Sequence, residues 1–278
     1  PARRSSDLFT MKHIRPFPII VAATLGLSSL LTAQDDEDKV VPDWQMAFEN
    51  LDATLRTEYN KHIYEASRLF NQKRIIESLN EVAEAEKIFD QGPAALNLLG
   101  ACHVEFRSFR KARIAFEKAL ALQKQYLKDL EDVRGDARLR RMRPVVNILF
   151  NIAEMDFVTG QWQDCHDRIE KMLPEIEPKN VSMIRLIEFK YMLCKLKIDR
   201  EDEARKLAEK YDYLEGSPLY YYANATRAYL DKKEADAERW RASARRIFRT
   251  AKILAPWEDT MSEYGYVKSF YGGVEKKE

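Results

Sequence analysis

Two short segments of this sequence could do chemistry, because each places a cysteine directly beside a histidine. Cys102-His103 lies in GACH and Cys165-His166 lies in DCHD. A thiolate activated by an imidazole is a nucleophile, and the same two residue types bind zinc. The alternatives are an enzyme with a Cys-His site, a metal site assembled from both pairs, or side chains that fill a hydrophobic core.

The local sequence favours the core. Both pairs lie in segments rich in helix-forming residues, and neighbours on a helix point about 100° apart, so they do not face each other. A catalytic thiol must lie within about 3 Å of the ring nitrogen. We therefore expect no catalytic residue, no metal site and no cofactor. We expect the three thiols of the chain to be small buried side chains: Cys102, Cys165 and Cys194.

Composition points to an all-helical protein. The 278 residues include only nine Gly and ten Pro, whereas β-rich folds need many turns. The formal net charge of +1 gives no indication of a nucleic-acid binder. Glycine-rich phosphate-binding motifs and zinc-protease motifs do not occur in the sequence.

The segment from Leu96 to Leu120 carries a recognisable pattern. Leu96 and Gly100 are followed by Ala112 and Phe116 at the spacing W-x2-L-G-x2-Y, then A-x3-F. This segment resembles the tetratricopeptide repeat (TPR) family, with His103 in place of the usual Tyr. In such a repeat two antiparallel helices cross where both carry small residues.

Weaker copies follow in the same register. Upstream, Ala66 and Ser78 take the two small positions, with helices expected over 55–70 and 75–89. Downstream copies begin near Val146, Arg185 and Leu219. The resemblance implies an all-α, right-handed superhelical array of antiparallel helical hairpins, a TPR-like α-solenoid of about five repeats. We expect a leading helix from about Trp44 to Tyr59.

An insertion over 121–144 interrupts the 34-residue period. We expect its first part to continue a helix to about Val133, with a break at Gly135. A basic cluster would then lie in an exposed loop before Pro144. That cluster would either contact an anion or simply face solvent; its members are Arg138, Arg140, Arg141 and Arg143.

The N-terminal part is expected to lie outside the fold. Residues 1–10 precede Met11 and are interpreted as upstream read-through; residues 11–33 have the charge and apolar run of a signal peptide. Cleavage after Ala33 would leave an acidic linker over 34–44 and a net charge of −2. The interpretation predicts a bacterial periplasmic or secreted protein. The alternative is an uncleaved anchor in the inner membrane, with the protein facing the periplasm.

The rest divides into a repeat domain over 45–254 and a C-terminal segment over 255–278. The aromatic residues of that segment would either cap the open end of the array or fold back as a partner segment: Trp257, Tyr264, Tyr266 and Phe270.

The resemblance also implies a concave groove that binds a peptide or protein. The expected function is a non-catalytic protein-protein interaction scaffold of the bacterial cell envelope. Its partner would be a protein or peptide, with no nucleic acid, and with membrane contact only if the leader is uncleaved. By register, the groove residues would be Asn97, Asn147, Phe150, Asn151, Glu154, Phe189, Tyr220, Asn224 and Arg227.

Overall fold

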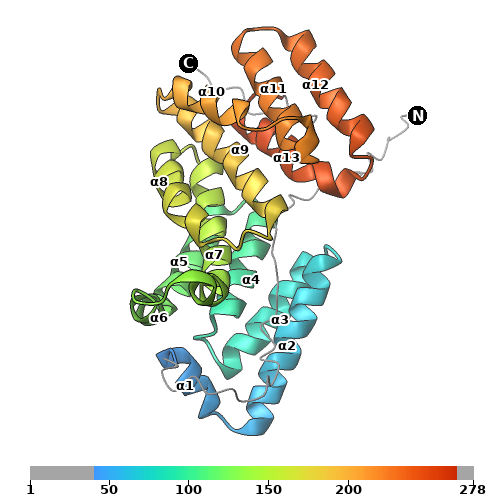
Figure 1. The fold of residues 1–278 in the computed structure, drawn as a ribbon. Coiled ribbons are helices and arrows are strands. Elements are labelled where there is room, and N and C mark those ends of the chain that lie inside the picture. Colours follow the sequence, from blue (N-terminus) through green and yellow to red (C-terminus); the bar gives the residue numbers. More distant parts are fainter. Residues whose placement is uncertain (1–40, 268–278) are drawn as a thin grey trace, which may run out of the picture.

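A computed structural model describes residues 41–267 of the chain. They form thirteen α-helices and two short 3-10 helices, with no strand in this range. Figure 1 shows the helices stacked side by side along an elongated molecule, from α1 at one end to α12 at the other. The leader (11–33) and Phe270 lie outside the described residues. Within 41–267, none of the helices combines the length and apolar character that a membrane span requires.

Ten of the helices form five antiparallel hairpins, so the predicted all-helical array of paired helices is confirmed. The pairs, in chain order, are α2 (Ala53–Asn71) with α3 (Ile75–Ile88), α4 (Pro93–Glu105) with α5 (Phe109–Leu122), α7 (Gly135–Val158) with α8 (Trp162–Met172), α9 (Val181–Lys197) with α10 (Glu201–Glu209), and α11 (Leu219–Leu230) with α12 (Glu234–Ile247). The remaining elements are α1 (Asp43–Glu49), α6 (Lys124–Asp129), η1 (Leu173–Glu175), η2 (Tyr213–Glu215) and α13 (Ala251–Tyr264).

The same chain reversal joins the two helices of every hairpin. One residue in each turn adopts a positive φ, and the next N–H bonds to a carbonyl five residues back, which is the Schellman pattern of helix ends. In the first hairpin the Arg74 N–H donates to the Leu69 carbonyl at 2.9 Å. The positive-φ residues are Lys73, Arg107, Gly160, Asp199 and Lys232. Backbone geometry thus repeats even where the side chains differ.

Small residues lie where the helices of a hairpin cross. A Cβ atom on Gly100 would lie 2.4 Å from the Phe116 ring, so only glycine fits against that aromatic residue. At the equivalent places, Ser78 Oγ donates to the Ala66 carbonyl at 2.8 Å and Cys165 Sγ contacts the Ala153 carbonyl at 3.4 Å. The repeat register read from the sequence therefore holds in the first three hairpins.

The expected leading helix from Trp44 to Tyr59 is wrong in its extent. The chain instead forms two helices, α1 ending at Glu49 and α2 beginning at Ala53. The Asp52 side chain accepts a hydrogen bond from the Thr54 N–H at 2.7 Å. An aspartate at this position caps a new helix, which is why the chain restarts here.

The insertion also differs from its prediction. Helix α5 ends at Leu122 and the short α6 follows, so no helix continues to Val133. Helix α7 then begins at Gly135, and the arginine cluster forms its first turns rather than a loop. Pro144 removes one backbone hydrogen bond but lies on the exposed side. Burial of Val145 and Val146 on the other side keeps the helix continuous.

Candidate functional site

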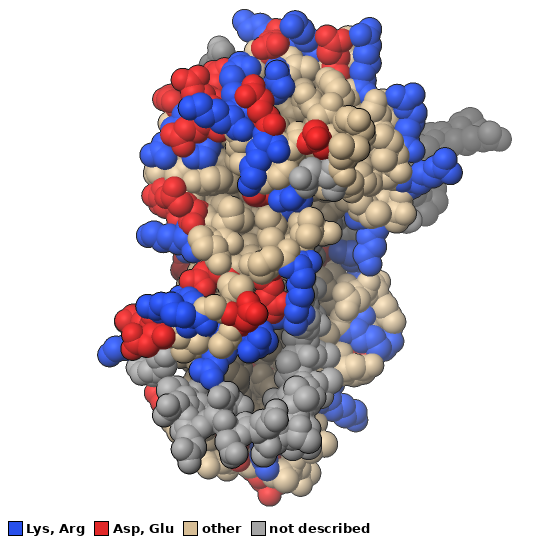
Figure 2. Space-filling model, viewed as in Figure 1, with Lys and Arg blue, Asp and Glu red and all other residues tan. Residues whose placement is uncertain are grey.

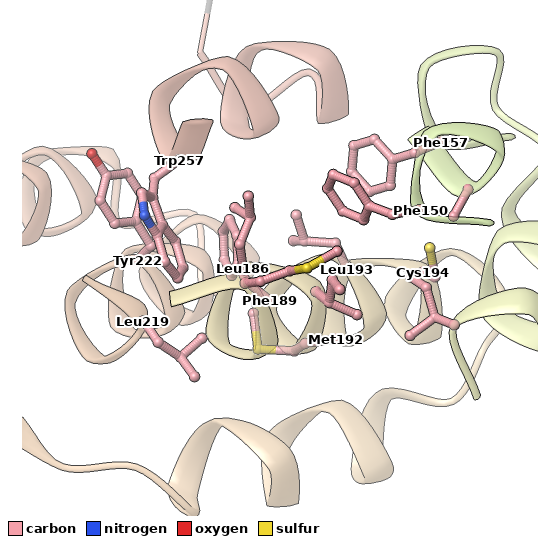
Figure 3. Packing of buried hydrophobic residues seen from close by; sticks show 14 of the residues in the cluster. Phe150, Phe157, Leu186, Phe189, Met192, Leu193, Cys194, Leu219, Tyr222 and Trp257 are labelled. Atoms are coloured by element: carbon pink, nitrogen blue, oxygen red, sulfur yellow. The ribbon is translucent and has the colours of Figure 1, made fainter. Parts of the chain in front are cut away.

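Helix α13 folds back across the first helices of the last three hairpins. Its Trp257 ring lies 5.3 Å from the ring of Phe189 on α9 and 5.6 Å from Tyr222 on α11. Figure 3 shows these three side chains meeting between the helices. The Tyr264 ring lies 6.4 Å from that of Phe157 on α7. We define the groove as the surface of α7, α9 and α11 that α13 covers.

The groove lies on the first helices of hairpins three to five, and α13 of the same chain occupies it. Phe157, Phe189 and Tyr222 are almost completely buried as a result. The described part of the C-terminal segment packs on the last hairpin, through α11 and α12, and also reaches back to α7 and α9.

A buried cluster of charges lies at the seam between α13 and the groove. Lys190 Nζ on α9 is 3.1 Å from Glu154 Oε2 on α7 and 3.7 Å from Glu263 Oε2 on α13. The same ammonium lies 4.3 Å from the centre of the Phe157 ring. Two carboxyl groups therefore share one buried ammonium group.

Burial and charge together set the protonation of this cluster. Desolvation raises the pKa of Glu263 to about 8, and the neighbouring Glu154 carboxylate opposes its ionisation further. Burial opposes the charge of Lys190, but the two carboxyl groups outweigh it and raise the pKa of Lys190. Glu263 is therefore the carboxyl group of this cluster whose ionisation the surroundings oppose.

A second carboxylate fixes the other side of α13. Glu258 accepts a hydrogen bond from the Tyr222 hydroxyl at 2.8 Å and lies 3.0 Å from Arg245 Nη1. Arg241, also on α12, pairs with the same carboxylate. Beyond the helix, Tyr266 stacks on Tyr229 with ring centres 4.8 Å apart. Glu258 and Tyr266 therefore hold α13 and the residues after it against α11 and α12.

Several predicted groove residues belong to the core instead. Phe150 is 3% exposed and Phe189 is 0% exposed, so a partner cannot touch them while α13 is in place. Asn151 is also buried and donates to Asn97 Oδ1 at 2.9 Å. Their assignment to an open surface was wrong because helix register gives the direction of a side chain but not what covers it.

Four other predicted groove residues lie at or beside open depressions, whereas Glu154 belongs to the buried charge cluster. Asn224 and Arg227 border a depression of about 450 Å³ between α11 and α12. Tyr220 lies beside it, with its ring edge on Trp240 at 5.6 Å. Asn147 borders a second depression, of about 280 Å³, between the starts of α7 and α9. The structure therefore distributes the predicted set over three surfaces rather than one.

The arginine cluster contributes to the second depression. The Arg138 guanidinium lies 2.7 Å from Glu175 Oε1, so this charge is paired. Arg143 lines the depression together with Lys179 and the carboxylates of Glu175 and Glu177. Figure 2 shows acidic and basic side chains interspersed over the visible face. An extended field of one sign, as an anionic polymer would need, is not present on that face.

The sequence left open whether the C-terminal aromatic residues cap the array or fold back as a partner segment, although α13 contains a further signal. Leu254, Trp257, Met261 and Tyr264 recur at spacings of three and four, the period of an amphipathic helix. All four are buried against the groove or its flanks. The pattern identifies a helix with one apolar face, but the sequence does not say which surface receives it.

The cysteines pack in the core, as predicted. All three thiols are free and buried. Burial raises the pKa of Cys102 to about 11, and contact with Cys194 together with burial raises that of Cys165. A nucleophile must be a thiolate near neutral pH, so these environments favour the unreactive form. Cys102 and Cys165 also belong to different hydrophobic clusters, so the two pairs do not meet.

His166 is held by neighbours on both ring nitrogens. Its Nδ1 lies 2.8 Å from Asp167 Oδ1, and its Nε2 lies 3.4 Å from both Lys195 Nζ and Arg200 Nη1. With Glu170, this histidine and Asp167 form a group of metal-ligating atoms within 4.8 Å of one another. Lys195 and Arg200 place two positive charges beside the ring, and these would repel a metal cation. The geometry therefore does not assign a metal here.

Comparisons with known proteins give little beyond the helical architecture. Neither a family model nor a curated protein matches the chain. The solved structure of YrrB, described as a TPR protein with an unusual peptide-binding site, is 14% identical. It covers 78% of this chain and 97% of its own, with a TM-score of 0.45. PilF of Pseudomonas aeruginosa is 12% identical and covers 76% of this chain and 99% of its own, with a TM-score of 0.37.

Proposed function

We propose that this protein is a non-catalytic scaffold that binds a protein or peptide partner. The supporting observation is the groove, which already holds a helix through aromatic contacts and a buried charge cluster. A surface built for such contacts recognises helical segments by shape and side-chain chemistry. The buried thiols give no support to a Cys-His enzyme.

We propose further that the protein acts in the bacterial cell envelope. The support for export is the sequence of residues 11–33, with its positive start and apolar run. N-terminal sequencing of the exported chain tests this proposal. A mature protein that starts at Gln34 supports export with cleavage, whereas a retained leader supports the membrane-anchored alternative.

Site-specific photocrosslinking tests partner binding. A photoreactive residue is placed at Lys197, whose Nζ lies 4.4 Å from the Tyr264 ring at the groove rim, and at Asn147 in the second depression. Ile114, exposed on α5, is the matched control. A binding scaffold gives one discrete crosslinked partner from at least one test position and none from Ile114. Equal and diffuse crosslinking at all three positions would contradict the proposal.

A further inference from the structure

We propose that the groove is an exchangeable helix-docking site, in which α13 is the resident occupant and an amphipathic helix of a partner protein takes its place. This inference rests on the proposed function and specifies the partner's chemistry. The contacts of α13 predict an aromatic residue, an apolar residue four positions later, a neutral hydrogen-bond donor two positions after that, and then an aromatic residue.

The apolar part of this pattern follows from what α13 contacts. Trp257 fits between the rings of Phe189 and Tyr222. Met261, four residues later, is completely buried, with its sulfur 3.9 Å from Thr226 Oγ1. Tyr264 follows three residues after Met261 and packs 5.7 Å from the ring of Trp162. Large aromatic anchors in closed pockets carry most of the energy in helix recognition.

The neutral donor follows from a mismatch between α13 and the groove. Lys190 offers one positive charge, while Glu154 and Glu263 bring two carboxyl groups to it. Glu154 Oε1 is buried and accepts no hydrogen bond. Burying an acceptor without a partner, or a carboxylate in excess of its counter-ion, destabilises the contact. An amide in place of Glu263 removes the excess acid and offers a donor beside Glu154.

The connection of α13 to the array allows it to leave as a unit. Residues 248–250 join α12 to α13 outside either helix, and Arg249 and Thr250 are exposed. Each of the five hairpins is closed by contacts between its own two helices. Release of α13 would therefore remove the contacts it makes between hairpins three to five, while the pairing of helices within each hairpin stays in place.

A peptide-binding experiment on the full chain tests the proposal. The probe is a labelled synthetic peptide with the sequence of residues 249–267, added at pH 8 to the native chain and to the W257A/M261A variant. Fluorescence anisotropy should show binding to the variant at least about tenfold tighter than to the native chain, because the variant's own α13 competes poorly. A peptide carrying Trp257→Ala is the matched control and should not bind.

A second pair of peptides tests the predicted neutral hydrogen-bond donor at position 263. A peptide with Glu263→Gln should bind the variant more tightly than the natural peptide at pH 8, and weaker binding would overturn this element. Circular dichroism checks that the variant remains helical. A helical variant that binds none of the peptides overturns the exchange proposal. Should the variant not fold, hydrogen exchange on the native chain decides: α13 amides as protected as those of α9 overturn the proposal, and clearly lower protection supports it.

These outcomes are separate from those of the scaffold proposal. Crosslinking at Asn147 does not depend on exchange of α13. If a discrete partner is crosslinked at Asn147 and no peptide binds the variant, the scaffold proposal stands and only the exchange proposal is overturned. If the peptide binds the variant but no partner is crosslinked, the exchange proposal stands and the scaffold function loses its support.

Discussion

The first two hairpins and the last three differ in how their cores are connected. Around α2 to α5, buried side chains form three separate small clusters, one of which also includes Ile148, Ile152 and Met155 of α7. From α7 to α13 they form one large continuous cluster. Helix α13 contributes to that continuity, since Trp257, Met261 and Tyr264 each touch a different hairpin.

The difference shows how one returning helix changes a linear array. An array in which each unit contacts only its neighbours has a stability that is close to a sum of local terms. A helix that spans three units adds contacts between residues distant in sequence and makes those units unfold together. We therefore expect the C-terminal hairpins to behave as one cooperative body and the N-terminal hairpins to respond locally.

The largest expected effect comes from removing the central anchor of α13. Trp257→Ala should lower the free energy of unfolding of the C-terminal hairpins by roughly 3–5 kcal/mol, as is typical for a large buried aromatic residue. Denaturant unfolding followed by circular dichroism measures it. Tyr64→Ala, at a side chain 56% exposed on α2, is the control and should change stability by less than about 0.5 kcal/mol. A loss as small as that of the control would mean that α13 does not connect the hairpins.

The next effect is a pH dependence confined to the same region. The pKa of Glu263 in the folded chain is about 8, above the ordinary glutamate value of 4.5, so the folded state binds the proton more tightly. Stability should therefore fall as the pH rises from about 4.5 to about 8, by an amount on the order of a few kcal/mol.

Glu263→Gln should remove most of this slope. The variant should be more stable than the native chain at pH 8, in unfolding curves recorded across that range. The electrostatic neighbours of Glu263, which both proteins share, are Lys190, Glu154, Asp259 and Arg107. Parallel pH profiles for the two proteins would show that Glu263 is ionised in the fold.

A smaller effect is expected in the N-terminal hairpins. Gly100→Ala forces a methyl group against the Phe116 ring and should destabilise the second hairpin by about 1–3 kcal/mol. Hydrogen exchange should rise mainly in α4 and α5. An equal rise in α9 and α11 would show that the two halves are coupled after all.

The smallest effect concerns a polar link between hairpins two and three. Asn97→Ala removes the acceptor of the Asn151 amide and should cost about 1 kcal/mol. Thermal unfolding measures it, with Asn60→Ala on the exposed part of α2 as control. If the Asn97→Ala and Asn60→Ala variants are equally stable, the Asn151 amide must have another hydrogen-bond partner.

Much of the fold could be read from the sequence because crossing residues and turns repeat. The helices expected over 55–70 and 75–89 are α2 and α3, within two residues at each end. Where local signals compete, prediction was wrong. Asp52 starts a new helix where the apolar pattern continued, and Pro144 stays inside α7 because its neighbours are buried.

The site could be predicted only in part. Register predicted Glu154 and Phe189 as groove residues, and the structure places Glu154 beside Lys190 and Phe189 against Trp257. The sequence left two arrangements open for the C-terminal segment, because folding back is decided by long-range packing of Trp257 and Tyr264 rather than by any local pattern. Phe189 therefore resembled an exposed anchor in sequence and is fully buried in the structure.

The repeated chain reversal has a consequence for how arrays of this kind change length. Four of the five turns use a non-glycine residue with positive φ: Lys73, Arg107, Asp199 and Lys232. Side chains other than glycine and asparagine rarely adopt this conformation, so the rest of each hairpin must hold it. Each hairpin is then a self-contained module that brings its own reversal. Duplication or deletion of one hairpin in a gene would leave the reversal inside every remaining hairpin intact, so the number of repeats can change in evolution without disturbing these turns.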